Sequence, residues 1–121
     1  MITVFTPTYN RAKMLPNLYD SLLNQTYRNF EWLIVDDGST DMTEEEVKSW
    51  QKEEKIEICY YKQANGGKHR AINKGVQMAR GDFFFIVDSD DYLPANSLQL
   101  VAKHSRQLAD DYTFCGVAAN R

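Results

Sequence analysis

The sequence is poor in cysteine, which excludes two classes of protein. Its 121 residues contain two cysteines, Cys59 and Cys115, with no CxxC pattern and no spacing typical of a metal site. A disulfide-rich secreted domain or a structural zinc site needs more cysteines than this. Because both residues lie inside apolar or aromatic stretches, we expect them to be reduced thiols in the core.

Long apolar runs and an excess of positive charge are also missing. No run approaches the roughly 20 apolar residues that a membrane-spanning helix requires. The amino-terminal stretch, MITVFTPTYN, lacks the basic and apolar regions of a secretory signal. We therefore expect a cytoplasmic protein and leave open a peripheral attachment to the inner face of a membrane. The formal net charge of −3 argues against a nucleic-acid partner.

What the sequence does contain is an alternation of predicted strands and helices. Short β-branched, apolar or aromatic runs predict strands at residues 2–6, 30–35, 56–61 and 82–87, with a fifth at 112–118. Apolar residues three or four positions apart predict a first helix across residues 15–23. Later helices are expected after a cap at Ser39, Thr40 or Asp41, between Gly67 and a stop at Gly81, and from Pro94 onward. Core-facing positions are predicted at Ile72, Val76 and Ala79, and at Leu98, Val101, Ser105 and Leu108.

This alternation with short connections is typical of βαβ units. We therefore expect one α/β domain over residues 1–121, with a mainly parallel sheet. Ligands bind such sheets beyond the carboxyl ends of the strands, where the strand order reverses. Polar residues follow three of the predicted strands, at residues 6–10, 36–41 and 88–91. The sequence therefore predicts a ligand site at that edge of the sheet.

The sharpest polar cluster lies in FFFIVDSDDYL, residues 83–93. Asp88, Asp90 and Asp91 directly follow an apolar run, and carboxylates this close repel one another. Oxygen ligands of this kind suit Mg²⁺ or Mn²⁺, which often bind one or two carboxylates together with a substrate's phosphates. We therefore predict a divalent metal here, with a simple polar turn capped by Asp91 as the alternative.

The second cluster, VDDGSTD at residues 35–41, follows the second predicted strand. An acid at this point of a doubly wound domain commonly binds a ribose hydroxyl or a base edge. One of Asp36 and Asp37 is therefore expected in the site, whereas Gly38 to Asp41 have the composition of a turn and a helix cap. Tyr9, after the first strand, is expected either to stack on a base or to pack over the first helix.

The third cluster, NGGKHRAINKG at residues 65–75, places glycines before a helix whose first turn is basic. Cations are unfavourable at a helix amino end unless an anion binds there. Lys68 or Arg70 is therefore expected to contact a phosphate, and His69 to be structural or to face solvent. Neither G-x-G-x-x-G nor GxxxxGK[ST] occurs, which argues against a dinucleotide-binding Rossmann domain and a P-loop protein.

Four stretches, in this order, resemble the family 2 glycosyltransferases, which have the GT-A fold. They are TPTYNR, FEWLIVDDGSTD, NGGKHRAINKG and ARGDFFFIVDSDDYL, together with Leu18, Ser21, Leu22 and Gln25 of the first helix, and they span about residues 3–94. The resemblance implies a Rossmann-like nucleotide-binding half with sheet order 3-2-1-4 and helices on both faces. It also implies inverting transfer from a nucleoside-diphosphate sugar, with Mn²⁺ or Mg²⁺, to a polysaccharide, lipid or protein-glycan acceptor.

The resemblance assigns roles to the residues near position 90. Asp88, Ser89 and Asp90 match the DXD element of the family. Asp88 would lie near the ribose, and Asp90 would bind a metal that bridges the diphosphate, with Asp91 assisting. A metal and a nearby cation would then neutralise the charge that develops on the departing diphosphate.

The resemblance also places a base pocket after the first two strands. Asp37, or Asp36, would read the base, and Thr6, Pro7 and Tyr9 would line its pocket. These assignments and the predicted metal site fall on the same edge of the sheet.

Two departures from the family pattern shape the expected function. Ile72 stands where many relatives have an arginine, which leaves Lys68 and Arg70 as the nearby cations. Family enzymes run to roughly twice this length, and their later half carries the acceptor site and the base that inverting transfer requires. Residues 110–121 hold no candidate for that base. We therefore expect a donor-binding domain that lacks the acceptor half and transfers sugar poorly or not at all.

Two other classes and one assembly state stay open. A haloacid-dehalogenase-like phosphatase also sets a D-x-D with Mg²⁺ after a buried strand, although that strand usually comes early in the chain. A non-catalytic nucleotide-binding module would share the pocket without consuming sugar. An uncovered sheet edge at residues 112–118 predicts pairing into homodimers.

Overall fold

The computed structural model describes residues 1–103. The predicted fifth strand at residues 112–118, Cys115, Ser105 and Leu108 lie outside the described residues. None of the helices in residues 1–103 has the length and the apolar character that a membrane-spanning segment needs.

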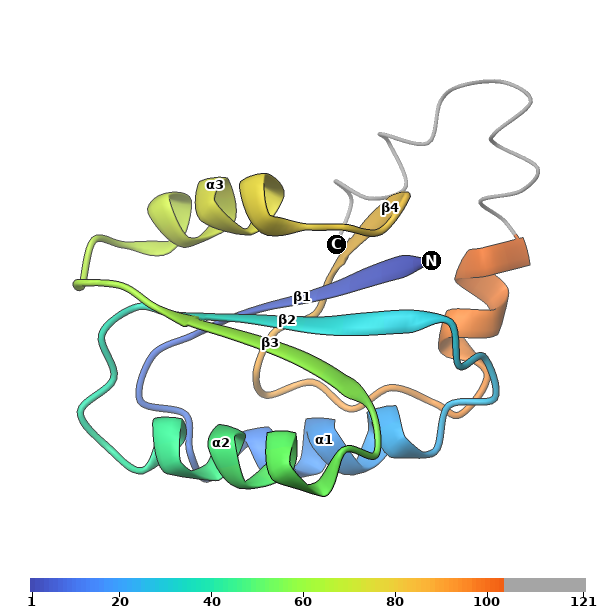
Figure 1. Ribbon diagram of the computed structural model, residues 1–121, viewed down its shortest axis with the longest axis horizontal. Helices are drawn as coiled ribbons and strands as arrows, with labels where there is room; N and C mark the ends of the chain where they lie inside the picture. Colours follow the sequence, from blue (N-terminus) through green and yellow to red (C-terminus); the bar gives the residue numbers. More distant parts are fainter. Residues whose placement is uncertain (104–121) are drawn as a thin grey trace.

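Four parallel strands form one sheet in the order β3-β2-β1-β4 (Figure 1). The strands are β1 at Ile2–Thr8, β2 at Phe30–Asp36, β3 at Glu57–Lys62 and β4 at Phe83–Ile86. The chain builds outward from β1 to β3 and then returns to the other side of β1 to form β4. The strand order therefore reverses at β1, and the predicted parallel sheet and its order are confirmed.

The helices cover both faces of the sheet, as predicted. These helices are α1 at Leu15–Leu23, α2 at Thr43–Glu53 and α3 at Lys68–Met78. Figure 1 shows α1 and α2 together on one face and α3 on the other. A further helix begins at residue 97, three positions later than the predicted start, because a turn closed by the Ser97 N–H and the Pro94 carbonyl precedes it.

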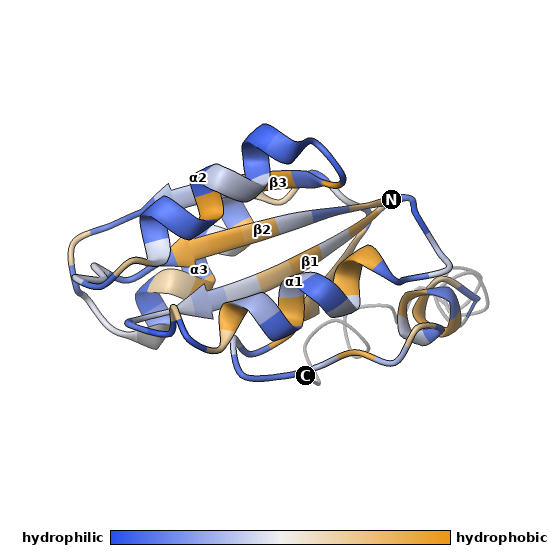
Figure 2. Ribbon diagram, turned by 90° about the horizontal axis from the view of Figure 1, so that it is seen from below, coloured by the Kyte–Doolittle hydropathy of each residue, from blue (hydrophilic) through white to orange (hydrophobic). Residues whose placement is uncertain are grey.

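The larger core lies between the sheet and the helices α1 and α2. Trp32 of β2, Tyr19 of α1 and Trp50 of α2 stack on one another, with ring centroids 4.4 to 6.0 Å apart. Leu98, from the helix that begins at residue 97, is fully buried in the same cluster. Figure 2 shows hydrophobic residues along β1 and β2, whereas α1 carries hydrophobic and hydrophilic segments in alternation. Burial of these side chains fixes α1 and α2 against the strands whose ends carry the polar loops.

The helix α3 packs on the opposite face in a register that differs from the predicted one. Val76, predicted to face the core, is 60% exposed, so that prediction is wrong. Gly75 faces the sheet instead, and a Cβ there would lie 2.3 Å from the ring of Phe5. Ile72 and Ala79 pack into this smaller core, as predicted. The missing side chain at Gly75 lets the helix approach the Phe5 ring closely, which an apolar periodicity cannot reveal.

Gly81 does not end α3, contrary to the prediction. The helix stops at Met78, and Ala79 is already extended. Gly81 instead lies against β1, where its N–H donates to the Thr3 hydroxyl at 2.8 Å and a Cβ would lie 2.6 Å from the Thr3 nitrogen. Close backbone approach, rather than helix termination, therefore requires glycine at this position.

A buried carboxylate anchors the connection from α3 to β4. Glu31 of β2 is 1% exposed and accepts hydrogen bonds from the Thr3 hydroxyl at 2.7 Å and the Arg80 N–H at 2.8 Å. The guanidinium of Arg80 also contacts Glu31, Glu57 and Cys59. These three residues have ligand atoms within 4.8 Å of one another, but the Arg80 guanidinium already supplies their positive charge. This cluster therefore serves the fold, and Cys59 is the half-buried free thiol within it.

Candidate functional site

Loops from the carboxyl ends of the four strands, together with α3, surround a cavity of about 510 Å³. It lies where the strand order reverses, the position at which open α/β sheets bind ligands. Its lining residues are Pro7, Thr8, Tyr9, Arg11, Asp37, Asn65, Ala71, Asp88, Ser89 and Asp90.

The loop after β1 contributes the aromatic part of this lining. Pro7 and Tyr9 line the cavity, and Tyr9 is 46% exposed, so its ring has a free surface. Thr6 does not line it. The Thr6 side chain is fully buried, and its hydroxyl accepts a hydrogen bond from the Trp32 indole N–H at 2.9 Å. Thr6 therefore supports the strand below the cavity.

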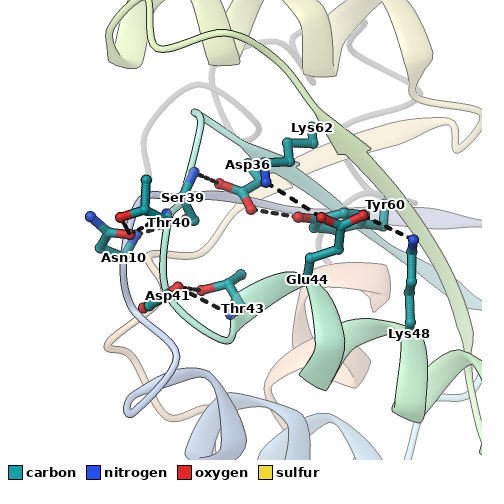
Figure 3. Close-up of polar contacts among 10 residues, drawn as sticks. All are labelled: Asn10, Asp36, Ser39, Thr40, Asp41, Thr43, Glu44, Lys48, Tyr60 and Lys62. Atoms are coloured by element: carbon teal, nitrogen blue, oxygen red, sulfur yellow. Dashed lines mark hydrogen bonds and ion pairs between the residues drawn. The ribbon is translucent and has the colours of Figure 1, made fainter.

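The two neighbouring aspartates at the end of β2 differ in their surroundings. Asp36 is fully buried and lies outside the cavity lining. Its Oδ1 accepts from the Ser39 N–H at 2.8 Å, and its Oδ2 accepts from the Tyr60 hydroxyl at 2.5 Å (Figure 3). Burial and this second hydrogen bond raise the pKa of Tyr60. Both oxygens of Asp36 are thus engaged in holding β2, its turn and β3 together.

Asp37 lines the cavity and also holds the loop that leads into α3. Its carboxylate accepts hydrogen bonds from the Gln63 amide at 3.0 Å, the Gly66 N–H at 2.8 Å and the Gly67 N–H at 3.0 Å. Burial alone would raise the pKa of Asp37, but these hydrogen bonds and the charge of Arg70 hold it below its ordinary value. The N–H groups of both glycines before α3 are therefore engaged by a carboxylate of the chain itself.

The basic residues that open α3 lie beside this loop. Arg70 is exposed, does not line the cavity and packs across Gly66, where a Cβ would lie 2.5 Å from the Arg70 Cδ. Lys68 is the first residue of the helix, and His69 is exposed to solvent.

The loop after β4 brings two carboxylates to the cavity. Asp88, Ser89 and Asp90 line it, and both aspartates are exposed whereas Ser89 is buried. Asp91 lies outside the lining, and its carboxylate accepts a hydrogen bond from the Asp88 N–H at 3.2 Å. The Asp91 N–H in turn donates to the Asp88 carbonyl at 3.0 Å. Asp91 therefore closes the turn that presents the other two.

The residues present fit a divalent metal that is shared with a ligand. In residues 1–103, three acid or thiol ligand atoms converge within 4.8 Å only at Glu31, Glu57 and Cys59, so the aspartates after β4 form no three-carboxylate cage. Asp88 and Asp90 still offer hard oxygen atoms to one cavity. Mg²⁺ and related ions commonly bind one or two carboxylates plus a substrate's phosphates, and this donor set matches that arrangement.

Four lining residues were not predicted from the sequence. Arg11 and Asn65 belong to the motifs TPTYNR and NGGKHRAINKG, so a sequence signal for them existed. Thr8 and Ala71 lie in the same two motifs. The Thr8 hydroxyl is buried without a hydrogen-bond partner among the described residues, at the cavity wall.

The fold of this chain is that of the GT-A class. The sheet order and the helices on both faces agree with this class. The sequence profile of Glycosyl transferase family 2 matches residues 3–121, and the chain belongs to this family.

Curated relatives carry the same assignment. The glycosyltransferase GlyG of Streptococcus pneumoniae is 35% identical over 99 residues, which are 82% of this chain and 33% of GlyG. An uncharacterized glycosyltransferase of Haemophilus influenzae is 30% identical over 100% of this chain and 50% of its own length. The chain thus spans between a third and a half of these two relatives.

Solved structures with similar folds include complexes with nucleotides. TarS of S. aureus, residues 1–349 in complex with UDP, superimposes with a TM-score of 0.80 at 32% identity, over 88% of this chain and 32% of TarS 1–349. The mannosyltransferase PcManGT of Pyrobaculum calidifontis, in complex with GDP-Man and Mn²⁺, gives a TM-score of 0.78 at 31% identity. The match covers 84% of this chain and 31% of the PcManGT chain.

Because the chain belongs to family 2, the alternative of a haloacid-dehalogenase-like phosphatase is set aside.

Proposed function

We propose that this chain is the donor-binding domain of an inverting glycosyltransferase. Its cavity would hold a nucleoside-diphosphate sugar together with Mn²⁺ or Mg²⁺. The observation that carries this proposal is the convergence of Tyr9, Asp37, Asp88 and Asp90 on one cavity at the reversal point of the sheet. The UDP complex of TarS and the GDP-Man and Mn²⁺ complex of PcManGT support it.

The base of the donor would bind between the loops after β1 and β2. The Tyr9 ring and Pro7 offer apolar surface for a base, and Asp37 supplies a carboxylate beside them. Asp36 and Thr6 would act indirectly, by holding β2 and β1 in place, because both are fully buried outside the lining. A base seated here would lie against rigid strand ends.

The diphosphate would bind toward the loop after β4. Asp88 would lie near the ribose, and Asp90 would hold the metal, with Asp91 supporting the turn. A bound metal supplies positive charge that stabilises the departing diphosphate. Lys68 or Arg70 from the first turn of α3 would add to this charge, and Arg11 is a cation already in the lining.

We assign neither the acceptor site nor the catalytic base to residues of this domain. Since the chain spans a third to a half of the first relatives, we propose that it provides the donor half, for transfer to a glycan or lipid-linked acceptor. By itself it would bind nucleotide and transfer sugar poorly, and a non-catalytic nucleotide-binding module remains the second candidate.

A melting-temperature panel tests donor binding. UDP, GDP and their sugars are each added with and without Mn²⁺, and stabilisation is expected only where nucleotide and metal are both present. Asp90→Asn should remove the metal-dependent part of the shift. Asp20→Asn, which changes an exposed carboxylate of α1, is the matched control and should behave as the wild type. A wild-type protein unaffected by every combination would overturn the proposal.

Turnover distinguishes the donor half from a complete enzyme. Release of nucleoside diphosphate from each sugar nucleotide is measured with the purified 121-residue chain. Little or no release is expected even where the nucleotide binds. Rapid release that Asp90→Ala abolishes would show that the chain has its own catalytic base.

A further inference from the structure

Hydrogen bonds join the loop after β1 to the loop after β2 at the rim of the cavity. The Asn10 N–H donates to the Ser39 hydroxyl at 2.8 Å, and the Asn10 side-chain oxygen accepts from the Thr40 N–H at 2.8 Å (Figure 3). Two residues after Asn10, the Ala12 N–H donates to an Asp41 side-chain oxygen at 3.1 Å. We name these five residues the loop clasp.

Asn10 meets two separate requirements of this clasp. Its φ angle is +52°, in the left-handed region that side chains other than glycine, asparagine and aspartate rarely adopt. Its side chain also supplies the acceptor for the Thr40 N–H. Glycine at this position would meet only the backbone requirement, because it has no side-chain acceptor. Alanine would meet neither requirement, and aspartate would meet both.

The clasp residues that follow β2 are hydrogen-bonded to neighbouring elements of the fold. The Ser39 N–H donates to buried Asp36 at 2.8 Å, which attaches this loop to the end of β2. Asp41 accepts from the Thr43 N–H at 3.0 Å and the Thr43 hydroxyl at 2.6 Å, which attaches it to the first turn of α2. The loop clasp therefore holds the loop after β1 in place against β2 and α2.

The neighbours of Asn10 are the residues that face the cavity. Tyr9 and Arg11 both line it, whereas Asn10 does not and turns its side chain to the Thr40 N–H instead. We propose that Asn10 is a positioning residue, which holds Tyr9 and Arg11 in place for binding of the nucleoside diphosphate. This inference rests on the proposed donor-binding function and adds to it a residue that touches no ligand.

Substitutions at position 10 separate the two requirements. Relative to the wild type, Asn10→Gly keeps the backbone conformation and removes the acceptor, so its affinity for nucleoside diphosphate with Mn²⁺ should fall about fivefold to tenfold, the value of one hydrogen bond. Asn10→Ala should lose more because it also strains the backbone, and Asn10→Asp should keep nearly wild-type affinity. Glu54→Gly is the matched control, since Glu54 is the other non-glycine residue with positive φ in residues 1–103, directly follows α2 and does not line the cavity.

Two readouts distinguish this inference from the proposed function. Affinity is measured by calorimetry at a temperature where melting curves show each variant folded, and hydrogen exchange of the Thr40 amide is measured without ligand. Faster Thr40 exchange with weaker binding in Asn10→Gly, and recovery of both in Asn10→Asp, is the expected result. Unchanged exchange would overturn the clasp, and faster exchange with unchanged affinity would overturn its role in binding. A wild-type protein that binds no nucleotide would overturn the proposed function and the binding role together, while Thr40 exchange would still decide the clasp.

Discussion

The carboxylate of Asp37 accepts a hydrogen bond from the N–H of Gly67 at 3.0 Å, which links the end of β2 to the start of α3. This contact places a negative charge at the amino end of α3, where the helix dipole favours it. It also accounts for the basic first turn of that helix, since the charge of Arg70 lowers the pKa of the same carboxylate. An arrangement that looked unfavourable in the sequence is thus compensated from another strand.

Asp37→Asn should destabilise the domain by about 1–3 kcal/mol. The amide keeps one acceptor oxygen but loses the charge that strengthens its hydrogen bonds to Gln63, Gly66 and Gly67. Urea unfolding of the variant and of the wild type, monitored by tryptophan fluorescence, gives the difference in the free energy of unfolding. A variant as stable as the wild type would show that these contacts add nothing in solution.

The same carboxylate predicts a dependence of stability on pH. Because the pKa of Asp37 is lower in the folded protein, the unfolded chain binds its proton more readily. Its contribution is therefore complete above the unfolded value of about 3.9 and is lost as the pH falls through the lower folded value. Asp41 and Glu31 act in the same direction. Urea midpoints from pH 6 downward should fall less steeply in Asp37→Asn, and parallel curves would contradict this account.

Gly75→Ala should cost about 1–3 kcal/mol, although alanine favours helices. The new methyl group would lie 2.3 Å from the Phe5 ring, so the ring or the helix must move. Val76→Ala, at an exposed position of the same helix, is the control and should change the free energy of unfolding by less than about 0.5 kcal/mol. The opposite order of effects would mean that α3 packs in the register predicted from the sequence.

Tyr60→Phe should destabilise the domain by about 1–3 kcal/mol, because it leaves one oxygen of buried Asp36 without its donor. Tyr61→Phe provides a control on the same strand, since it keeps the ring that Lys74 covers at 4.8 Å. Thermal unfolding of both variants measures the difference. Equal melting temperatures would show that the Tyr60 hydroxyl is not needed to satisfy Asp36.

Much of the fold was predictable because its signals are local. The apolar runs at the four described strands and the helical spacing of Leu15, Leu18 and Leu22 are properties of neighbouring residues. The α3 register was not predictable in this way. Val76 looks like a core residue, but Gly75 packs on Phe5, a contact between positions 70 residues apart (75 − 5).

The sequence by itself determined that acidic residues gather at the carboxyl ends of parallel strands, because strand–helix alternation fixes which end each loop occupies. Only the tertiary structure decided which acids face the cavity. Asp36 accepts a hydrogen bond from the Tyr60 hydroxyl, and Asp91 accepts one from a backbone N–H of its own turn. The acids that line the cavity are Asp37, Asp88 and Asp90. The physical reason is that adjacent side chains of one type differ only in the partners that the folded chain brings to them.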